Sequence, residues 1–299
     1  MNAVQEKWIK ALGKPSDRGK YGSAALTNSG SRDEFDYEIY SQENGKGKSQ
    51  RTVMLFPKEI KEPTPAVIVP FYYPERMIGF NLVGDEPVNV CVDAEMMLQL
   101  VRRGYITVSA ESYHLSYIES EKGRDDFTRW QDAADALRAD HPEYQGIGKL
   151  VDDTRLLVDL VCRDARVNKD RIGIAGHSLG GKMAFYTGCL DDRIKVILAS
   201  DFGIGWDQTN WRDDWYWGGE VDRLIAKGMD HTELLSAAAP KPFCLIAGEF
   251  DNDESYKMML RAKGYCENDG RLKFINHATG HHPPIWALNE GYDFLDKFI

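Results

Sequence analysis

From residue 65 onward, the sequence alternates short apolar runs with longer segments that have helical spacing. The apolar runs are rich in β-branched residues, which is typical of strands buried on both faces. They read PAVIVPF, YITVSAE, RIGIAG, KVILASDF, PFCLIAGEF and LKFINHA. The helical patterns between and after them include DAEMMLQLVRRG, KLVDDTRLLVDLVCRDA, SLGGKMAFYTGCL and ALNEGYDFLDKFI. Alternation of this kind predicts parallel strands with right-handed crossovers, so we expect an α/β fold with helices on both faces of the sheet.

The segment before residue 65 has a different pattern. FDYEIYS and QRTVMLFP alternate in polarity and are joined by a glycine-containing turn, which predicts an antiparallel hairpin. The first dozen residues predict a short amphipathic helix with Trp8 on its apolar side, and the Gly/Ser/Asn-rich stretch 14–32 predicts an arm or irregular loop. We therefore divide the chain into an N-terminal helix and arm (1–32) and one large domain (33–299).

Ser178 lies in the stretch RIGIAGHSLGGKMA, where a strand pattern ends and a helical pattern begins. A glycine-x-serine-x-glycine sequence at such a junction predicts a sharp turn that lifts the serine hydroxyl above the sheet. Side chains crowd this turn, which accounts for glycine at positions 176 and 180. The backbone N–H of Leu179, the first residue of the helix, would point toward the same space and suits an oxyanion. The alternative is a glycine-rich helix start capped by a serine that does no chemistry.

A nucleophilic serine needs a base to remove its proton and an acid to orient that base. The order expected along the chain is serine, acid, histidine, and two later loops at the ends of strands offer the partners. In GHHPP we expect His281 rather than His282 to be the base. In GEFDNDE our first choice for the acid is Asp251, with Glu249 as the alternative. Asp201, which closes the strand KVILASD, is a third candidate.

A second oxyanion donor should come from the loop FYYPERM, which follows the strand PAVIVP. We assign it to the backbone N–H of Tyr73, with Tyr72 close behind; a backbone donor requires no particular side chain. Among the other histidines, we expect His177 to be a packing residue and His231 to lie at the surface, with contact to a substrate as the alternative for His231.

Three of these motifs occur together in the order of a known superfamily. GHSLGG after RIGIA, GEFD after an apolar strand, and GHHPP before a final helix resemble the α/β-hydrolase superfamily. The stretches RRGYITVSAE, NKDRIGIAGHSLGGKMAFYTGCLDDRIK and APKPFCLIAGE look like its dienelactone hydrolase and acetyl xylan esterase-like branch, over about residues 50–299. The resemblance implies a serine nucleophile, an acyl-enzyme and no metal. The three-layer α/β sandwich already follows from the alternating pattern, and we expect no cofactor.

The segment from about 202 to 240 is polar and rich in tryptophan, and it lies where α/β-hydrolases commonly carry a cap over the active site. Four of the seven tryptophans of the chain fall in it, namely Trp206, Trp211, Trp215 and Trp217. One interpretation is that these rings pack the cap onto the body, because aromatic side chains mainly bury area. The other is that they bind substrate as a platform for a sugar ring. The mixture of aromatic and polar residues favours a hydroxylated substrate.

These observations favour a serine esterase that acts on a small-molecule ester, such as an acetylated carbohydrate. The alternatives within enzymes are a lactone hydrolase and a small peptidase of the same fold. A non-enzymatic binding module is disfavoured because both the serine and the histidine are present.

Composition excludes several other classes. The formal net charge is -10 and basic residues are not clustered, which argues against nucleic acid as a partner. No run of about 18 apolar residues predicts a membrane helix. The five cysteines are scattered, and the N-terminus lacks an apolar signal core, so we expect a cytoplasmic protein with reduced thiols. The N-terminal arm is available to contact a second copy, which leaves a homo-oligomer open.

Overall fold

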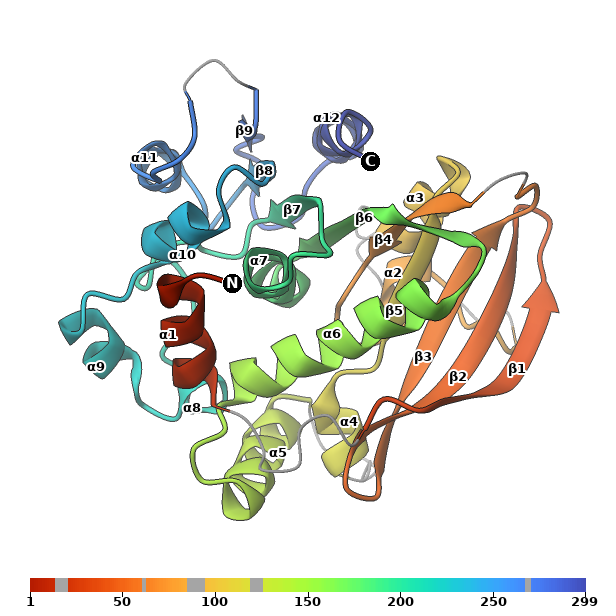
Figure 1. Cartoon of the computed structure of the whole chain (residues 1–299), viewed down its shortest axis with the longest axis horizontal. Helices are drawn as coiled ribbons and strands as arrows, with labels where there is room; N and C mark the ends of the chain where they lie inside the picture. The colour runs from red at the N-terminus through yellow and green to blue at the C-terminus, as the bar shows by residue number, and fades with distance from the viewer. Residues whose placement is uncertain (14–20, 61–62, 85–94, 119–125, 267–269) are drawn as a thin grey trace.

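The computed structural model describes residues 1–13, 21–60, 63–84, 95–118, 126–266 and 270–299 (Figure 1). Within these residues, nine strands form one sheet in the order β1-β2-β3-β5-β4-β6-β7-β8-β9. They are β1 (Ala24–Ser31), β2 (Phe35–Gly45), β3 (Lys48–Pro57), β4 (Thr64–Ile68), β5 (Ile106–Ala110), β6 (Val167–His177), β7 (Val196–Ser200), β8 (Phe243–Ala247) and β9 (Leu272–Asn276). β1, β2 and β3 pair antiparallel with their neighbours, whereas β4 to β9 run parallel. The predicted hairpin and the predicted parallel sheet are therefore confirmed.

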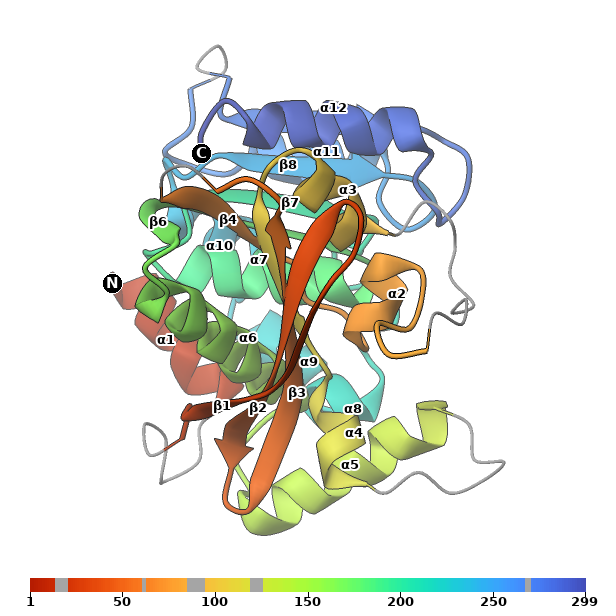
Figure 2. The same cartoon turned by 90° about the vertical axis from the view of Figure 1, so that its right-hand side faces the viewer.

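Helices cover both faces of the sheet and make three layers. The helices of the main layers are α1 (Ala3–Leu12), α2 (Pro74–Ile78), α3 (Met96–Arg102), α6 (Gly146–Arg163), α7 (Leu179–Leu190) and α12 (Ile285–Leu295). Figure 2 shows α12 on one side of the sheet and α1, α6 and α7 on the other. α2 and α3 share the apolar cluster of α12, and the opposite cluster contains α1, α6 and α7. The α/β sandwich expected from the alternating pattern is thus confirmed.

The remaining helices lie around this core. They are α4 (Tyr113–Tyr117), α5 (Asp126–Asp140), α8 (Asp214–Trp217), α9 (Val221–Ala226), α10 (His231–Ala238) and α11 (Asp253–Leu260). The sequence patterns did not predict α4, α5, α8, α9 or α10, and the expected loop FYYPERM is helical from Pro74, where α2 begins. The helix expected from Asp93 corresponds to α3, and its first two residues lie outside the described ranges. None of the helices in the described ranges combines the length and apolar character needed to cross a bilayer.

The segment 14–32 is not an irregular loop throughout. Residues Ala24–Ser31 form the edge strand β1, so the prediction of an irregular loop is wrong for them. Residues 14–20, the first part of the predicted arm, lie outside the described ranges. The sequence AALTNSGS has low strand propensity and most of its side chains are exposed. Backbone pairing with β2 forms this strand, and no apolar alternation marks it in the sequence.

Helix α1 packs into the body of the protein through Trp8. This indole is fully buried and lies 6.2 Å from the ring of Trp206 and 5.7 Å from that of Tyr186. The residues expected as a cap therefore share an aromatic cluster with the N-terminal helix and with α7. The N-terminal helix contributes to the core through this cluster.

We predict that Trp8→Ala lowers the free energy of unfolding by about 3–5 kcal/mol, because it leaves a large cavity in this cluster. Urea denaturation measures the change. Trp286→Ala is the matched control, since that indole is 51% exposed and should change stability by less than about 0.5 kcal/mol. Equal losses in the two variants would show that Trp8 does not anchor the helix.

His231 is fully buried, so the expected surface position is wrong. Its Nδ1 lies 2.6 Å from the carbonyl oxygen of Ile204, and its Nε2 lies 2.6 Å from the hydroxyl of Tyr186. Burial lowers the pKa of His231 to about 4. The imidazole is therefore a neutral link between α7, α10 and the segment after β7.

The lowered pKa of His231 predicts a loss of stability in acid. Because the pKa of an exposed histidine is about 6.5, the unfolded chain binds more protons than the folded chain between about pH 6.5 and 4. The contribution of neutral His231 to the free energy of unfolding is complete above this pH window. It is lost as pH falls through the window, by up to about 1.4 kcal/mol per pH unit. His231→Gln should reduce the slope of stability against pH, measured by urea denaturation at pH 7, 6 and 5, and leave the part that the buried His177 contributes. An unchanged slope would mean that His231 already titrates normally.

Candidate active site

The turn between β6 and α7 holds Ser178 in a strained backbone conformation, with φ 55° and ψ -117°. A Cβ on Gly176 would lie 2.1 Å from the carbonyl oxygen of Gly180, and a Cβ on Gly180 would lie 2.1 Å from that of Pro70. Only glycine fits at both positions, because any side chain would overlap the backbone. The strand–turn–helix context expected from the sequence is present and presents the hydroxyl at the carboxyl end of β6.

His281 lies beside this hydroxyl. Its Nε2 is 2.9 Å from Ser178 Oγ, and its Nδ1 is 2.7 Å from Asp201 Oδ2. The carboxylate of Asp201 is fully buried and the imidazole is 22% exposed, so solvent reaches His281 but not the acid behind it. Ser178 follows β6, Asp201 follows β7 and His281 follows β9. The carboxyl ends of these strands meet at one edge of the parallel sheet.

Asp201 is fixed as a carboxylate by the turn that follows β8. Its Oδ1 accepts hydrogen bonds from consecutive backbone N–H groups, those of Gly248, Glu249, Phe250 and Asp251, at 2.9–3.1 Å. Burial opposes ionisation, but the hydrogen bonds from His281 and the backbone outweigh it and hold the pKa of Asp201 below its ordinary value. Asp201 therefore stays negatively charged next to the imidazole.

The structure does not place Asp251, our first choice for the acid, beside His281. Its carboxylate accepts hydrogen bonds from the N–H groups of Gly203 and Ile204, both at 2.8 Å, and from the hydroxyl of Ser255 at 2.9 Å. Burial raises the pKa of Asp251 to about 6. Glu249, the alternative, donates only its backbone N–H to Asp201, and its side chain is exposed. The third candidate, Asp201, is the one in contact with the histidine.

Two more imidazoles surround His281. His177 packs against it with ring centroids 4.6 Å apart, and His282 lies 5.4 Å away. His177 is buried, with its Nδ1 3.2 Å from the hydroxyl of Ser200, as expected for a packing residue. Burial and the nearby charge of His281 lower the pKa of His177 to about 3, so it stays neutral.

The two backbone groups expected to form an oxyanion hole lie on elements adjoining the nucleophile. Leu179 is the first residue of α7, and Tyr73 immediately precedes α2. Ser112 anchors the loop before Tyr73, since its hydroxyl donates to the carbonyl of Phe71 at 2.7 Å and its N–H donates to that of Tyr72 at 2.9 Å. Contact between Pro70 and Gly180 holds this loop against the nucleophile turn.

The four tryptophans expected as a sugar platform are buried. The exposed fractions of Trp206, Trp211, Trp215 and Trp217 are 7%, 0%, 5% and 1%. The indole N–H groups of two of them bind carbonyls, Trp206 that of Met229 and Trp211 that of Gly203. A stacking platform needs an exposed ring face, so the assignment to substrate binding is wrong and the packing interpretation applies.

Lys182 is a buried residue near the site that the sequence reasoning missed. It lies one turn after Ser178 in α7, and its Nζ donates to Asn210 Oδ1 at 2.8 Å. The rings of Trp211 and Tyr216 each lie 4.8 Å from this ammonium, and burial lowers its pKa to about 7. A lysine in an apolar helix gives no sequence signal for burial, because its environment depends on the cap that folds over it.

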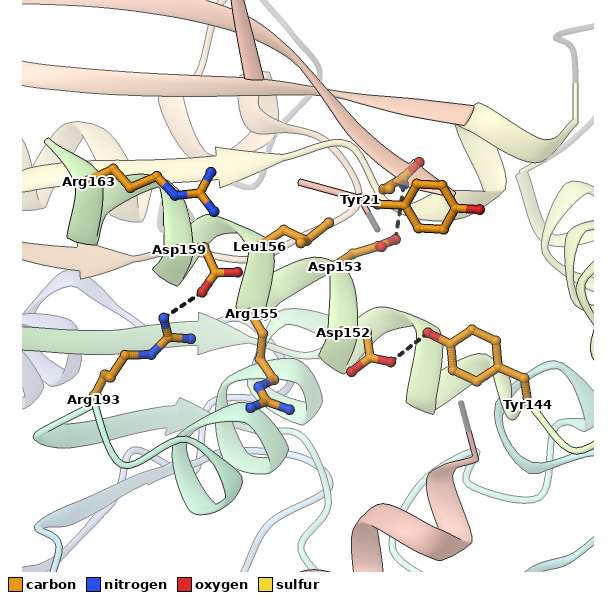
Figure 3. A pocket seen from close by; sticks show the side chains of 10 residues that line it. Tyr21, Tyr144, Asp152, Asp153, Arg155, Leu156, Asp159, Arg163 and Arg193 are labelled. Atoms are coloured by element: carbon orange, nitrogen blue, oxygen red, sulfur yellow. Dashed lines mark hydrogen bonds and ion pairs between the residues drawn. The ribbon is translucent and has the colours of Figure 1, made fainter. Parts of the chain in front are cut away.

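A separate cavity of about 370 Å³ lies along α6, away from these residues (Figure 3). Its charged side chains are engaged with one another and with their neighbours. Arg193 pairs with Asp159, the hydroxyl of Tyr144 donates to Asp152, and Asn44 donates to Asp153. None of Ser178, His281 and Asp201 lines this cavity, and we assign it no part in the chemistry.

Comparison with known proteins gives a family match and one curated relative. A family model described as the Abhydrolase family matches residues 15–212. A curated protein described as putative hydrolase YtaP, from Bacillus subtilis (strain 168), is 26% identical over 164 residues, which cover 51% of this chain and 54% of that protein. The chain thus spans about half the length of this relative.

Solved structures share the fold at low sequence identity. A glucuronoyl esterase from Solibacter usitatus superposes with a TM-score of 0.73 at 12% identity, covering 98% of this chain and 90% of that one. A putative acetyl xylan esterase from Bacteroides fragilis NCTC 9343 gives 0.68 at 16% identity, covering 92% and 72%. An acetyl xylan esterase from Paenibacillus sp. R4 gives 0.62 at 13% identity, covering 100% of both chains. At these identities the likeness shows the fold alone.

Proposed function

We propose that this chain, which belongs to the abhydrolase family, is a serine esterase that forms an acyl-enzyme on Ser178. The observation that carries the proposal is the hydrogen-bonded relay from Ser178 Oγ to His281 Nε2 and from His281 Nδ1 to Asp201 Oδ2. A hydroxyl, an imidazole and a buried carboxylate in this arrangement activate a serine for attack on a carbonyl. The family match accords with the resemblance to α/β-hydrolases found in the sequence.

The relay accounts for both halves of ester hydrolysis. His281 removes the proton of Ser178 as Oγ attacks the ester carbonyl, and it then gives that proton to the oxygen of the departing alcohol. A water molecule attacks the acyl-serine while His281 acts again as base, and the carboxylic acid leaves with Ser178 restored. Asp201 holds the imidazole in orientation and stabilises its charged form, which its lowered pKa permits.

The developing oxyanion needs donors that are already in place. We assign these to the backbone N–H groups of Leu179 and Tyr73. Leu179 begins α7, so the positive end of the helix dipole adds to its N–H. The anchored loop between β4 and α2 fixes the position of Tyr73.

For the substrate we propose a small acyl ester of a carbohydrate, such as an acetylated sugar. The structural neighbours support this, since they are described as a glucuronoyl esterase, an acetyl xylan esterase and a putative acetyl xylan esterase. We also propose a cytoplasmic location, because four described cysteines (Cys162, Cys189, Cys244 and Cys266) are free thiols, which suits a reducing compartment.

A substrate panel tests the proposal. We expect acetate release from acetylated xylo-oligosaccharides and from aryl acetates, with kcat/KM falling as the acyl chain of the aryl ester lengthens. A lactone and a peptide amide in the same panel should be poor substrates. Failure of the folded protein to hydrolyse any ester would contradict the proposed activity, and turnover of the lactone alone would identify a lactone hydrolase instead.

A further inference from the structure

Arg76 lies on the first helix after the oxyanion loop. It belongs to α2, and its backbone N–H donates to the carbonyl of Tyr73, the assigned oxyanion donor, at 3.3 Å. The loop that leads into α2 packs on the nucleophile turn through Pro70 and Gly180. Figure 2 shows α2 on the same side of the molecule as the start of α12, and His281 precedes Ile285, the first residue of α12, by four residues in the chain. Arg76 thus lies beside the edge of the sheet that carries the relay.

The guanidinium of Arg76 is held in one orientation by aromatic neighbours. Its Nε donates to the hydroxyl of Tyr73 at 2.9 Å. Its central carbon lies 5.0 Å from the ring of Tyr73 and 5.5 Å from that of Tyr72. Cation–π contacts of this kind fix a guanidinium without neutralising its charge. The terminal N–H groups of Arg76 make no hydrogen bond to the described residues.

No carboxylate within the described ranges forms an ion pair with Arg76. The adjacent acid, Glu75, is bound by both terminal nitrogens of Arg51 on β3. Among the described residues, Arg76 is therefore a partly buried cation whose two terminal nitrogens have no hydrogen-bond acceptor. A fork of this geometry binds a carboxylate through two parallel hydrogen bonds.

We propose that Arg76 makes the active site selective for esters whose alcohol part carries a carboxylate, such as an acetylated acidic sugar. The inference rests on the proposed esterase function and names the substrate class for it. The chain as a whole has a net charge of -10 and repels anions at long range. An anionic substrate thus needs a local cation, and Arg76 supplies one next to the assigned oxyanion donor.

A matched pair of substrates tests this. One is methyl glucuronoside monoacetate with a free carboxylate, and the other is methyl glucoside acetylated at the same hydroxyl. We expect the wild type to favour the acidic sugar through a lower KM, by about tenfold in kcat/KM, because one charged hydrogen-bonded pair is gained. Arg76→Gln should abolish the preference, and Arg76→Lys should restore part of it, since the charge returns without the fork. Salt should weaken the wild-type preference.

Arg171→Gln is the control for net charge. It removes the same charge from an exposed position on β6, seven residues before Ser178, and should leave the preference intact. No preference in the wild type, or a preference that survives Arg76→Gln, would overturn the inference. Aryl acetate hydrolysis separates this outcome from failure of the proposed function, because an esterase without the acidic preference still turns over that neutral ester.

Discussion

Ser178→Ala is expected to lower kcat/KM for an ester substrate by at least about 10⁴-fold. The loss is large because the hydroxyl is the only group in the relay that can form the acyl-enzyme, so base and acid are left without a nucleophile. Hydrolysis of an aryl acetate measures it. The fold should persist, since the change removes one hydrogen bond to His281 and keeps the backbone turn.

Ser200→Ala serves as the matched control for this substitution. Ser200 also carries a hydroxyl near an imidazole, but it faces His177 rather than His281. We expect its loss to reduce kcat/KM by less than about tenfold, since it touches no reacting atom. If Ser178→Ala kept more than a few per cent of the activity in folded protein, another residue would have to be the nucleophile.

Asp201→Asn should produce the second largest effect, a loss in kcat of about 10³–10⁴-fold. An amide in place of the carboxylate cannot stabilise the imidazolium that forms as Ser178 attacks. It can also turn an N–H toward His281 Nδ1 and so favour the wrong tautomer. The measurement is kcat for an aryl acetate, with thermal unfolding of each variant to exclude loss of structure.

Asp251→Asn is the comparison that assigns the acid. Asp251 binds the backbone after β7 and the hydroxyl of Ser255, and it makes no hydrogen bond to His281. Its replacement should therefore lower kcat by less than about tenfold. Equal losses of kcat in the two variants, or a greater loss in Asp251→Asn, would contradict Asp201 as the acid and favour Asp251, in the loop after β8.

The sandwich could be predicted from the sequence because its strands are buried on both faces. Short continuous apolar runs such as PAVIVPF and KVILASDF fit few structures other than a buried strand. A glycine-rich junction indicates where such a strand ends and the next helix begins. The placement of Ser178 and His281 together follows from the same rule, since loops at the carboxyl ends of parallel strands meet at one edge.

The acid could not be chosen from the sequence because two aspartates end neighbouring strands. Asp201 and Asp251 lie close enough for the N–H of one to bind the carboxylate of the other. Which carboxylate faces His281 depends on the direction of each side chain, and spacing along the chain does not determine it. The positive φ of Asp201, 42°, which turns its side chain toward the N–H groups after β8, has no sequence signal.

For a related reason, the sequence left the role of the tryptophans open and gave no sign of strand β1. Trp211 and Trp217 lie among polar residues in the sequence, yet α1 and α7 cover them in the fold. β1 has the composition of a loop, but its backbone pairs with the edge of β2 and so joins the sheet. In both cases contacts between residues distant in sequence override the local pattern.

Labelling with a fluorophosphonate probe tests the central claim most directly, because the probe reacts only with a serine that its neighbours activate. Mass spectrometry of the digested protein locates the adduct. We expect one adduct, on Ser178, in the folded wild type, none after unfolding in urea, and much slower labelling in His281→Ala. A folded protein that stays unlabelled, or an adduct on another serine, would contradict the assignment of Ser178, His281 and Asp201 as a working relay.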